Sequence, residues 1–141
     1  MQYLLDTCVF AEYSNPKPVH GVRDWLAGQP KRSLFISVVS IGEIQKGIAR
    51  LALSKRRTGL EGLLEEILMR YKEQILDLDR YTLLLWGKLN AELEIKGRPL
   101  PVLDSLIAAT ALQRDITLVT RNTVDFTFTG VKLFNPWRST N

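Results

Sequence analysis

The sequence predicts an α/β fold with a mainly parallel sheet, and the alternation of two kinds of segment leads to that class. Short apolar runs typical of buried strands alternate along the chain with longer segments of helical periodicity. That alternation is the pattern of strand–helix–strand units, whose parallel sheet is covered by helices on both faces. The length of 141 residues lies within the usual size of one compact unit, so we expect a single domain over residues 1–141.

The first third of the chain contains two predicted strands and one predicted helix. Residues 3–6 and residues 34–37 are short apolar runs, each suited to a buried strand. Between them, residues 19–28 place Val22, Trp25 and Leu26 at helical spacing, after a segment that prolines interrupt. We therefore expect strand, helix and strand in that order.

Two capping-box signals predict the starts of the next two helices. Ser40 is followed three residues later by Glu43, and Thr58 is followed three residues later by Glu61. Apolar residues at helical spacing follow each signal. On this interpretation the basic segment 54–57 is a loop between the two helices.

The second half of the chain continues the alternation of strands and helices. The later predicted elements are a strand at 75–78, a helix from the cap Asp79 to about Lys96 that Gly97 stops, a helix at 102–114, and strands at 116–120 and 131–134. Right-handed crossovers between parallel strands would place every strand's carboxyl end at one edge of the sheet.

Composition excludes several classes of protein. A single cysteine, Cys8, allows no intramolecular disulfide and no thiolate metal cluster. The chain shows no secretory signal and no apolar stretch long enough to span a bilayer, so we expect a cytoplasmic protein. The single histidine, His20, falls in a predicted surface helix and is expected to be structural or solvated. A net charge of +4 is compatible with a polyanionic partner and with an ordinary basic surface.

Polar residues that could carry chemistry fall at strand ends and helix starts. They are Asp6, Glu43, Asp104, Asn122 and Asp125. In a doubly wound sheet these positions gather at the carboxyl edge, where ligands bind. Singly, most have a structural explanation as helix caps, helix-dipole partners or turn formers. Asp6 is the exception, because it ends an apolar strand where an unpaired charge is costly.

Together, these side chains predict a site for a hard cation. Carboxylates that meet at one edge repel one another unless a cation lies between them. Oxygen ligands without histidine or cysteine suit Mg²⁺ or Mn²⁺, which can activate water for phosphodiester hydrolysis. Nearby, Gly47 would leave room for a backbone to approach, and Lys46, Arg50 and residues 55–57 could hold phosphates.

Four motifs resemble those of PIN-domain ribonucleases, and more narrowly the VapC-type and FitB-like toxins of toxin–antitoxin pairs. The matching segments are residues 4–7, residues 40–44 with 47–48, residues 104–111, and residues 119–122 with 125–126 and 134–137. They span nearly the whole chain in the family's order. One departure is Cys8, which stands where the family usually has asparagine.

The resemblance implies a PIN fold of four or five parallel strands and Mg²⁺- or Mn²⁺-dependent cleavage of RNA. By motif position, Asp6, Glu43 and Asp104 would be the catalytic and metal-binding acids, and Asn122 would take the fourth position. Whether Asn122 or Asp125 supplies a fourth ligand stays open. Possible supporting residues are Thr7, Thr120 and Asp125, and possible contacts to RNA phosphates are Lys46, Arg50 and Arg121.

The resemblance also implies partners. These are a structured RNA substrate such as tRNA or rRNA, a cognate VapB-like antitoxin, and a second copy of the chain in a homodimer or in a heteromer with the antitoxin. The apolar stripe from Leu60 to Ile75 and the helix around Trp86 are candidate contact surfaces, with core packing as the alternative explanation for both.

Other functions fit the sequence less well. One is a degenerate PIN module that binds RNA or a protein without cleavage, and retention of the three acids argues against it. A DNA-directed nuclease stays open, because an acidic pocket does not distinguish the sugars. A haloacid-dehalogenase phosphatase would need a second aspartate at the position of Cys8.

Overall fold

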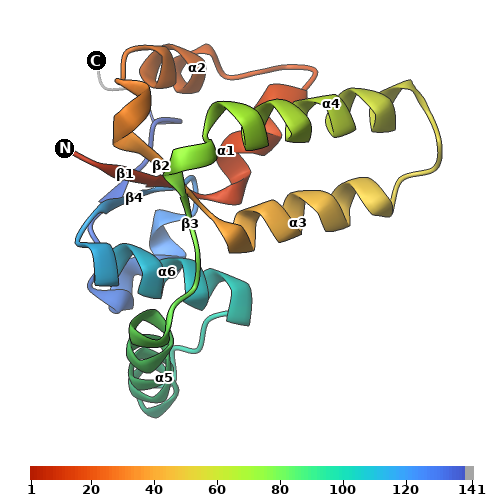
Figure 1. Cartoon of the computed structure of the whole chain (residues 1–141). Helices are drawn as coiled ribbons and strands as arrows, with labels where there is room; N and C mark the ends of the chain where they lie inside the picture. Colours follow the sequence, from red (N-terminus) through yellow and green to blue (C-terminus); the bar gives the residue numbers. More distant parts are fainter. Residues whose placement is uncertain (139–141) are drawn as a thin grey trace.

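Five short strands form one parallel sheet at the centre of the chain (Figure 1), in a computed structural model that describes residues 1–138, apart from the side chain of Ser14. The strands are β1 (Tyr3–Leu5), β2 (Leu34–Ser37), β3 (Ile75–Leu76), β4 (Thr117–Val119) and β5 (Leu133–Phe134). Their order across the sheet is β3-β2-β1-β4-β5, and every neighbouring pair is parallel. The parallel α/β class predicted from the sequence is confirmed.

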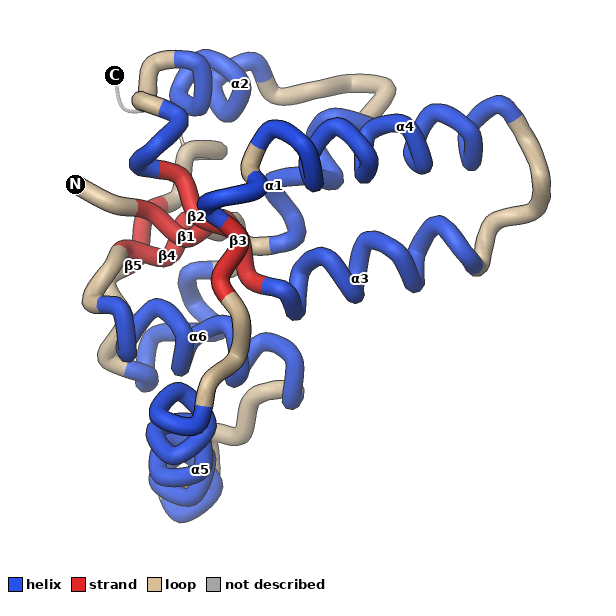
Figure 2. Tube along the Cα trace, viewed as in Figure 1, coloured by secondary structure: helices blue, strands red, loops and turns tan. Residues whose placement is uncertain are grey.

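Helices cover both faces of this sheet (Figure 2). The α-helices are α1 (Thr7–Ala11), α2 (His20–Ala27), α3 (Val38–Ala49), α4 (Lys55–Arg70), α5 (Arg80–Ile95) and α6 (Val102–Arg114). Four 3₁₀ segments join them: η1 (Glu12–Ser14), η2 (Lys31–Ser33), η3 (Lys72–Gln74) and η4 (Thr123–Thr129). None of the helices in the described part of the chain has an apolar stretch of bilayer-spanning length.

The central strand divides the core into two clusters. Successive strand residues point to opposite faces of a sheet, so Leu4 and Leu5 pack in different clusters. Leu4 belongs to a cluster with residues of α5 and α6, such as Leu93 and Ile107. Leu5 belongs to a cluster with residues of α1, α2 and α4, such as Ile67. A strand buried on both faces explains why β1 is apolar until it ends at Asp6.

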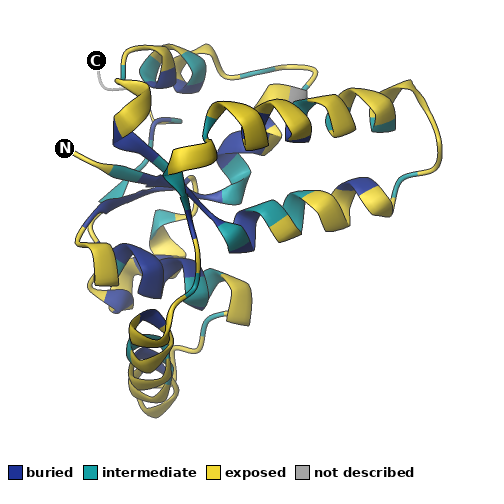
Figure 3. Cartoon of the chain, in the orientation of Figure 1, coloured by how far each residue is buried: buried dark blue, intermediate teal, exposed yellow. Residues whose placement is uncertain are grey.

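Helices α3 and α4 form an antiparallel pair that extends away from the sheet (Figure 1). Much of its surface is exposed (Figure 3). In the stripe singled out from the sequence, Leu64 and Ile67 are buried in the core, whereas Leu68 is 40% exposed. Trp86 on α5 donates its indole N–H to Oγ of Ser105 at 2.9 Å, which ties α5 to α6 as expected for internal packing.

In the second half of the chain, the predicted helix starts and ends agree with the structure. Helix α6 has the predicted bounds, and Asp79 caps α5 by accepting the backbone N–H of Thr82 at 2.8 Å. Gly97 follows the end of α5 with a φ of +69°, a conformation that glycine adopts without strain.

The two predicted capping boxes are wrong. The N-cap of α3 is Ser37, whose hydroxyl accepts the N–H of Val39, so Glu43 lies in the second turn and not in the first. The N-cap of α4 is Ser54, and the supposed loop 55–57 is its first turn. Each helix starts before the first apolar residue of its periodic pattern. Its N-cap is the last residue with an extended backbone, which here is Ser37 or Ser54.

Two further elements were not predicted from the sequence. Helix α1 has only five residues, too few for an apolar period to be recognised. The segment η4, for which the sequence predicted no helix, is a 3₁₀ helix of seven residues that buries Phe126. Both elements border the carboxyl edge of the sheet, so both bear on the site described next.

Candidate active site

Asp6 lies at the carboxyl end of β1, where its side chain caps α1. Its exposed fraction is 5%, and both carboxylate oxygens accept hydrogen bonds. Oδ1 accepts the backbone N–H of Thr7, and Oδ2 accepts the hydroxyl of Thr120 from β4's end, both at 2.8 Å. The cost of burying this charge is thus offset by directed donors, which also fix the carboxylate's orientation.

Thr7 connects Asp6 to the second acid of the site. Its hydroxyl donates to Oε1 of Glu43 at 2.7 Å and shares a hydrogen bond of 2.9 Å with the buried hydroxyl of Ser40. Thr7 therefore contacts two different carboxylates. Its backbone N–H donates to Asp6, and its side-chain hydroxyl donates to Glu43. Helix α3 starts directly after β2, which brings Glu43 beside the end of β1.

Asp104 lies in the first turn of α6, where the charges of the other acids act on its carboxyl group. Burial, followed by the negative charges of Asp6, Glu43 and Asp125, raises the pKa of its carboxyl to about 6. Four acids from four segments therefore share one electrostatic environment. Across residues 1–138, however, no three His, Cys, Asp or Glu side chains lie at the spacing of a formed metal-ligand cluster.

Cys8 occupies the space between Asp6 and Thr120. Its Sγ lies 3.8 Å from Oδ2 of Asp6 and 3.7 Å from Oγ1 of Thr120. Burial and the neighbouring Asp6 carboxylate raise the pKa of the thiol to about 11. The group is therefore a neutral thiol at neutral pH.

Asn122 follows β4 at the same edge of the sheet. Its backbone N–H donates to Oγ1 of Thr120 at 3.1 Å, and its carbonyl accepts the N–H of Asp125 at 3.1 Å. These bonds shape the turn that leads into η4. The Asn122 side chain is exposed, and Asp125 is the member of this turn whose charge acts on Asp104.

Of the basic residues singled out from the sequence, Arg56 lines a hollow that also contains Glu43. Lys46 on α3 and Arg50, which caps the end of α3, are both exposed on the same side as Glu43, and helical spacing places Arg50 about 10 Å farther along the axis. The guanidinium of Arg121 lies 6.0 Å from the ring centre of Trp137. His20 is exposed at the start of α2, as expected.

Two hollows adjoin the acids. One runs between α3 and α4 and is lined by Thr7, Glu43 and Gly47 together with apolar side chains and Arg56. The other is lined by Asp104, Asp125, Arg98 and Phe128 with neighbouring apolar residues. Sequence reasoning missed Arg98 and Phe128, because an arginine after a helix and a phenylalanine in a turn carry no motif.

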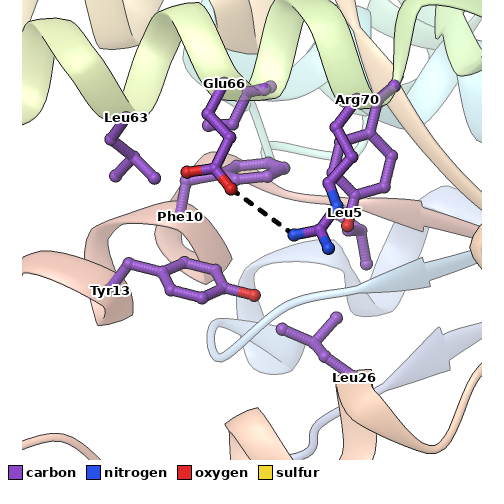
Figure 4. A pocket seen from close by; sticks show the side chains of 9 residues that line it. Leu5, Phe10, Tyr13, Leu26, Leu63, Glu66 and Arg70 are labelled. Atoms are coloured by element: carbon purple, nitrogen blue, oxygen red, sulfur yellow. Dashed lines mark ion pairs between the residues drawn. The ribbon is translucent and has the colours of Figure 1, made fainter.

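A third hollow, beneath α4, is not a candidate for the chemistry. It is lined mainly by apolar and aromatic side chains, including Leu5, Phe10 and Leu63 (Figure 4). Glu66 and Arg70, its two charged lining residues, pair with each other at 3.5 Å. None of the acids predicted for the site lines it.

Comparison with known proteins identifies the family to which this geometry belongs. The family model for the PIN domain matches residues 3–128, which include every acid described above. The chain belongs to the PIN-domain family. The toxin FitB of Neisseria gonorrhoeae is 32% identical over 135 residues, which cover 95% of this chain and 97% of that protein.

Two further similarities agree with this membership. The VapC ribonuclease Y4jK of Sinorhizobium fredii is 30% identical, over 95% of this chain and 96% of that protein. A solved structure of FitAB bound to an IR36 DNA fragment superposes with a TM-score of 0.92 at 30% identity, covering 99% of each chain. The fold of this PIN-domain protein therefore extends across essentially the whole length of its structural relative.

Proposed function

We propose that this PIN-domain protein is the endoribonuclease toxin of a toxin–antitoxin pair and hydrolyses phosphodiester bonds in RNA. The observation that carries the proposal is the convergence of Asp6, Glu43 and Asp104 at one edge of the sheet, where burial and the neighbouring acids raise the pKa of Asp104 to about 6. Relatives named as a toxin and as a VapC ribonuclease support the same activity. The substrate class proposed is a structured RNA such as tRNA or rRNA.

The side chains at the site fit a hard divalent cation. The donors are carboxylate oxygens without imidazole or thiolate, which is the set that Mg²⁺ and Mn²⁺ prefer. Asp6, Glu43 and Asp104 would hold the ion, and either Asn122 or Asp125 would complete the set. Such an ion supplies an activated water and neutralises charge on the phosphodiester.

The chain's own residues hold the acids in position for that chemistry. Thr120 and the N–H of Thr7 orient the Asp6 carboxylate, and the hydroxyl of Thr7 orients that of Glu43. These hydrogen bonds restrain the orientation of both carboxylates. Lys46, Arg50 and Arg121 would hold RNA phosphates around the site.

The proposal includes the partners of such a toxin. We propose a cognate VapB-like antitoxin, a homodimer or a heteromer with that antitoxin, a single domain, and a cytoplasmic location. The solved FitAB complex supports the antitoxin. The groove between α3 and α4, which reaches from Glu43 to apolar residues such as Ile48 and Leu51, offers a peptide access to the acids.

The experiment is cleavage of a total-RNA pool by the purified chain, with Mg²⁺, with Mn²⁺ and with EDTA. Asp6→Asn is the test variant, and Asp24→Asn, an exposed change on α2, is the matched control. We expect discrete cuts that need the metal, disappear in Asp6→Asn and persist in Asp24→Asn.

Cuts that persist unchanged in a folded Asp6→Asn variant would contradict the site assignment. No cuts under any metal condition, from folded chain free of antitoxin, would favour the alternative of a PIN module that binds RNA or a protein without cleavage.

A further inference from the structure

Apart from Asp104 and Asp125, the residues that line the hollow on the α5 side of Asp104 have no role in the function proposed above. The hollow shares Asp104 with the acidic site, and η4 adds Val124, Asp125 and Phe128. Its remaining walls are Leu93, Arg98 and the segment Pro99–Pro101. It is therefore an open site beside a catalytic acid, built from three separate segments.

Arg98 and Phe128 form a stacked pair at this hollow. The guanidinium carbon of Arg98 lies 4.5 Å from the ring centre of Phe128. The other cation–π pairs of the described chain are at 5.8 to 6.0 Å, so this pair is the tightest of the four. Both side chains are exposed, Phe128 to 49%, so both are open to solvent and to a ligand.

The backbone that carries each side chain of this pair is anchored to the rest of the fold. Arg98 donates its N–H to the carbonyl of Leu93 at 2.8 Å, and Gly97 donates to Glu94 at 3.0 Å. These two bonds form a Schellman end to α5, which requires the positive φ of Gly97. On the other side, η4 is anchored by Phe126, which is 1% exposed.

The charges in the hollow indicate which part of an RNA it would accept. Asp104 and Asp125 repel a phosphate, whereas a neutral nucleobase can stack on a guanidinium or aromatic plane and donate its exocyclic amine to a carboxylate. Arg98 takes part in none of the ion pairs formed within residues 1–138, so its guanidinium is available to a ligand. An apolar protein partner would instead bury three charged groups.

We infer that this hollow is a nucleotide subsite, in which an unpaired base of the RNA next to the cleaved phosphate stacks on the Arg98–Phe128 pair. The inference rests on the proposed function, because it takes RNA as the ligand and Asp104 as a site acid. It makes Arg98 and Phe128 specificity-determining residues that select a single-stranded nucleotide at the cut.

The first test is binding without cleavage. A fluorescein-labelled single-stranded RNA of mixed sequence is titrated with the full chain in EDTA, and anisotropy reports the affinity. We expect Phe128→Ala and Arg98→Ala each to weaken binding roughly tenfold, the usual loss for one base stack. Phe128→Trp, which keeps an aromatic plane, should retain the wild-type affinity within about twofold.

Tyr81→Ala is the matched control. Tyr81 also faces an arginine, Arg80, with 5.9 Å between the guanidinium carbon and the ring centre, and it is 60% exposed at the start of α5. It does not line the hollow that contains Asp104. Removal of this ring should leave RNA affinity unchanged, although it removes the same kind of surface pair.

The second test uses the unaltered chain, so it does not depend on how the variants fold. RNA that carries 5-iodouridine is irradiated in the complex, and the cross-linked peptide is identified by mass spectrometry. We expect cross-links within residues 124–128. Cross-links confined to other segments would overturn the inference.

The outcomes separate this inference from the proposed function. If RNA is cleaved and Arg98→Ala and Phe128→Ala leave affinity and cut sites unchanged, the inference fails and the ribonuclease stands. If no cleavage occurs but both variants weaken binding, the ribonuclease fails, and the hollow is a nucleotide-binding site with no cut beside it. Loss of binding in Arg98→Ala alone would reduce the role to charge and overturn stacking. A change of oligomeric state in Phe128→Ala without loss of RNA binding would assign the surface to a protein contact and overturn the inference.

Discussion

The hydroxyl of Thr120 donates to Oδ2 of Asp6 at 2.8 Å, across the pairing of β4 with β1. The hydroxyl oxygen of Thr120 also accepts the backbone N–H of Asn122, at 3.1 Å. One fully buried hydroxyl therefore sets the orientation of the first acid and the start of the turn that leads to Asp125.

Thr120→Val should damage both the site and the fold. The isosteric change leaves a carboxylate oxygen of Asp6 and the N–H of Asn122 without their partner, which costs about 1–3 kcal/mol of unfolding free energy. Loss of an orienting partner to a site carboxylate typically lowers activity by roughly 10–100-fold. Urea unfolding and RNA cleavage measure the two effects.

Thr120→Ser is the control, because serine keeps the hydroxyl and removes only a methyl group. We expect it to recover most of the cleavage. A Val variant with wild-type cleavage would show that this hydrogen bond does not position Asp6.

Asp104→Asn should stabilise the metal-free protein while it abolishes cleavage. The partly buried Asp104 carboxylate is disfavoured by burial and by the charges of Asp6, Glu43 and Asp125. A neutral amide removes both costs, so we expect the Tm in EDTA to rise by about 2–5 °C. Added Mg²⁺ should then raise the Tm of the wild type more than that of the variant.

Thermal unfolding at pH 7.5 with and without EDTA provides the measurement, and Asp24→Asn serves as a control for loss of one surface charge. A variant that melts below the wild type in EDTA would mean that the acids are not in net repulsion.

The hydrogen bonds that Glu12 accepts should stabilise the folded protein by an amount that falls in acid. This buried carboxylate accepts the backbone N–H of Val19 and the indole N–H of Trp137, the latter at 3.1 Å. The bond from Val19 is the main reason that the pKa of Glu12 lies below its ordinary value of 4.5. A depressed folded pKa means that the stabilisation is complete above pH 4.5 and is lost as the pH falls below it.

Glu12→Gln keeps the shape of the side chain and removes the titration. We expect the variant to be less stable than the wild type at pH 7, and the difference to shrink as the pH falls from 4.5 toward 3. Denaturant unfolding across this range gives the two curves. If they run parallel below pH 4.5, Glu12 does not carry this dependence.

Sequence information predicted the fold best where the signal was local. The cap Asp79, the terminator Gly97 and the helix after Pro101 all act within a few residues of their own position, and the structure has them as predicted. Ser37 and Ser54 were missed as caps for the opposite reason. A serine is a cap only if its own backbone is extended, which depends on where the preceding strand or turn ends.

The site was predictable in outline and not in its hydrogen bonds. Asp6 and Asp104 could be placed together because strand ends and helix starts converge at one edge of a parallel sheet. The bonds from Thr7 to Glu43 and from Thr120 to Asp6 join residues 36 and 114 positions apart. Such pairs depend on side-chain rotamers across neighbouring elements, which one sequence does not reveal.

Gly47 lies on α3 at the groove that also contains Glu43. A Cβ added at Gly47 would meet no atom within 4 Å, and the same is true of Gly59 on α4. Glycine inside a helix costs roughly 0.5–1 kcal/mol relative to alanine. Gly47→Ala and Gly59→Ala should therefore each raise the unfolding free energy by about that amount, as measured by urea denaturation.

Replacement by leucine should affect inhibition by the antitoxin differently at Gly47 and at Gly59. Gly59 does not line the groove, so Gly59→Leu should leave inhibition of RNA cleavage by the proposed antitoxin unchanged. Gly47→Leu places a side chain in the open space between α3 and α4, where a peptide would lie. The antitoxin concentration needed for half-inhibition should rise severalfold in Gly47→Leu, while the chain's own cleavage of RNA continues. Equal inhibition of both leucine variants would show that the peptide reaches the acids by another route.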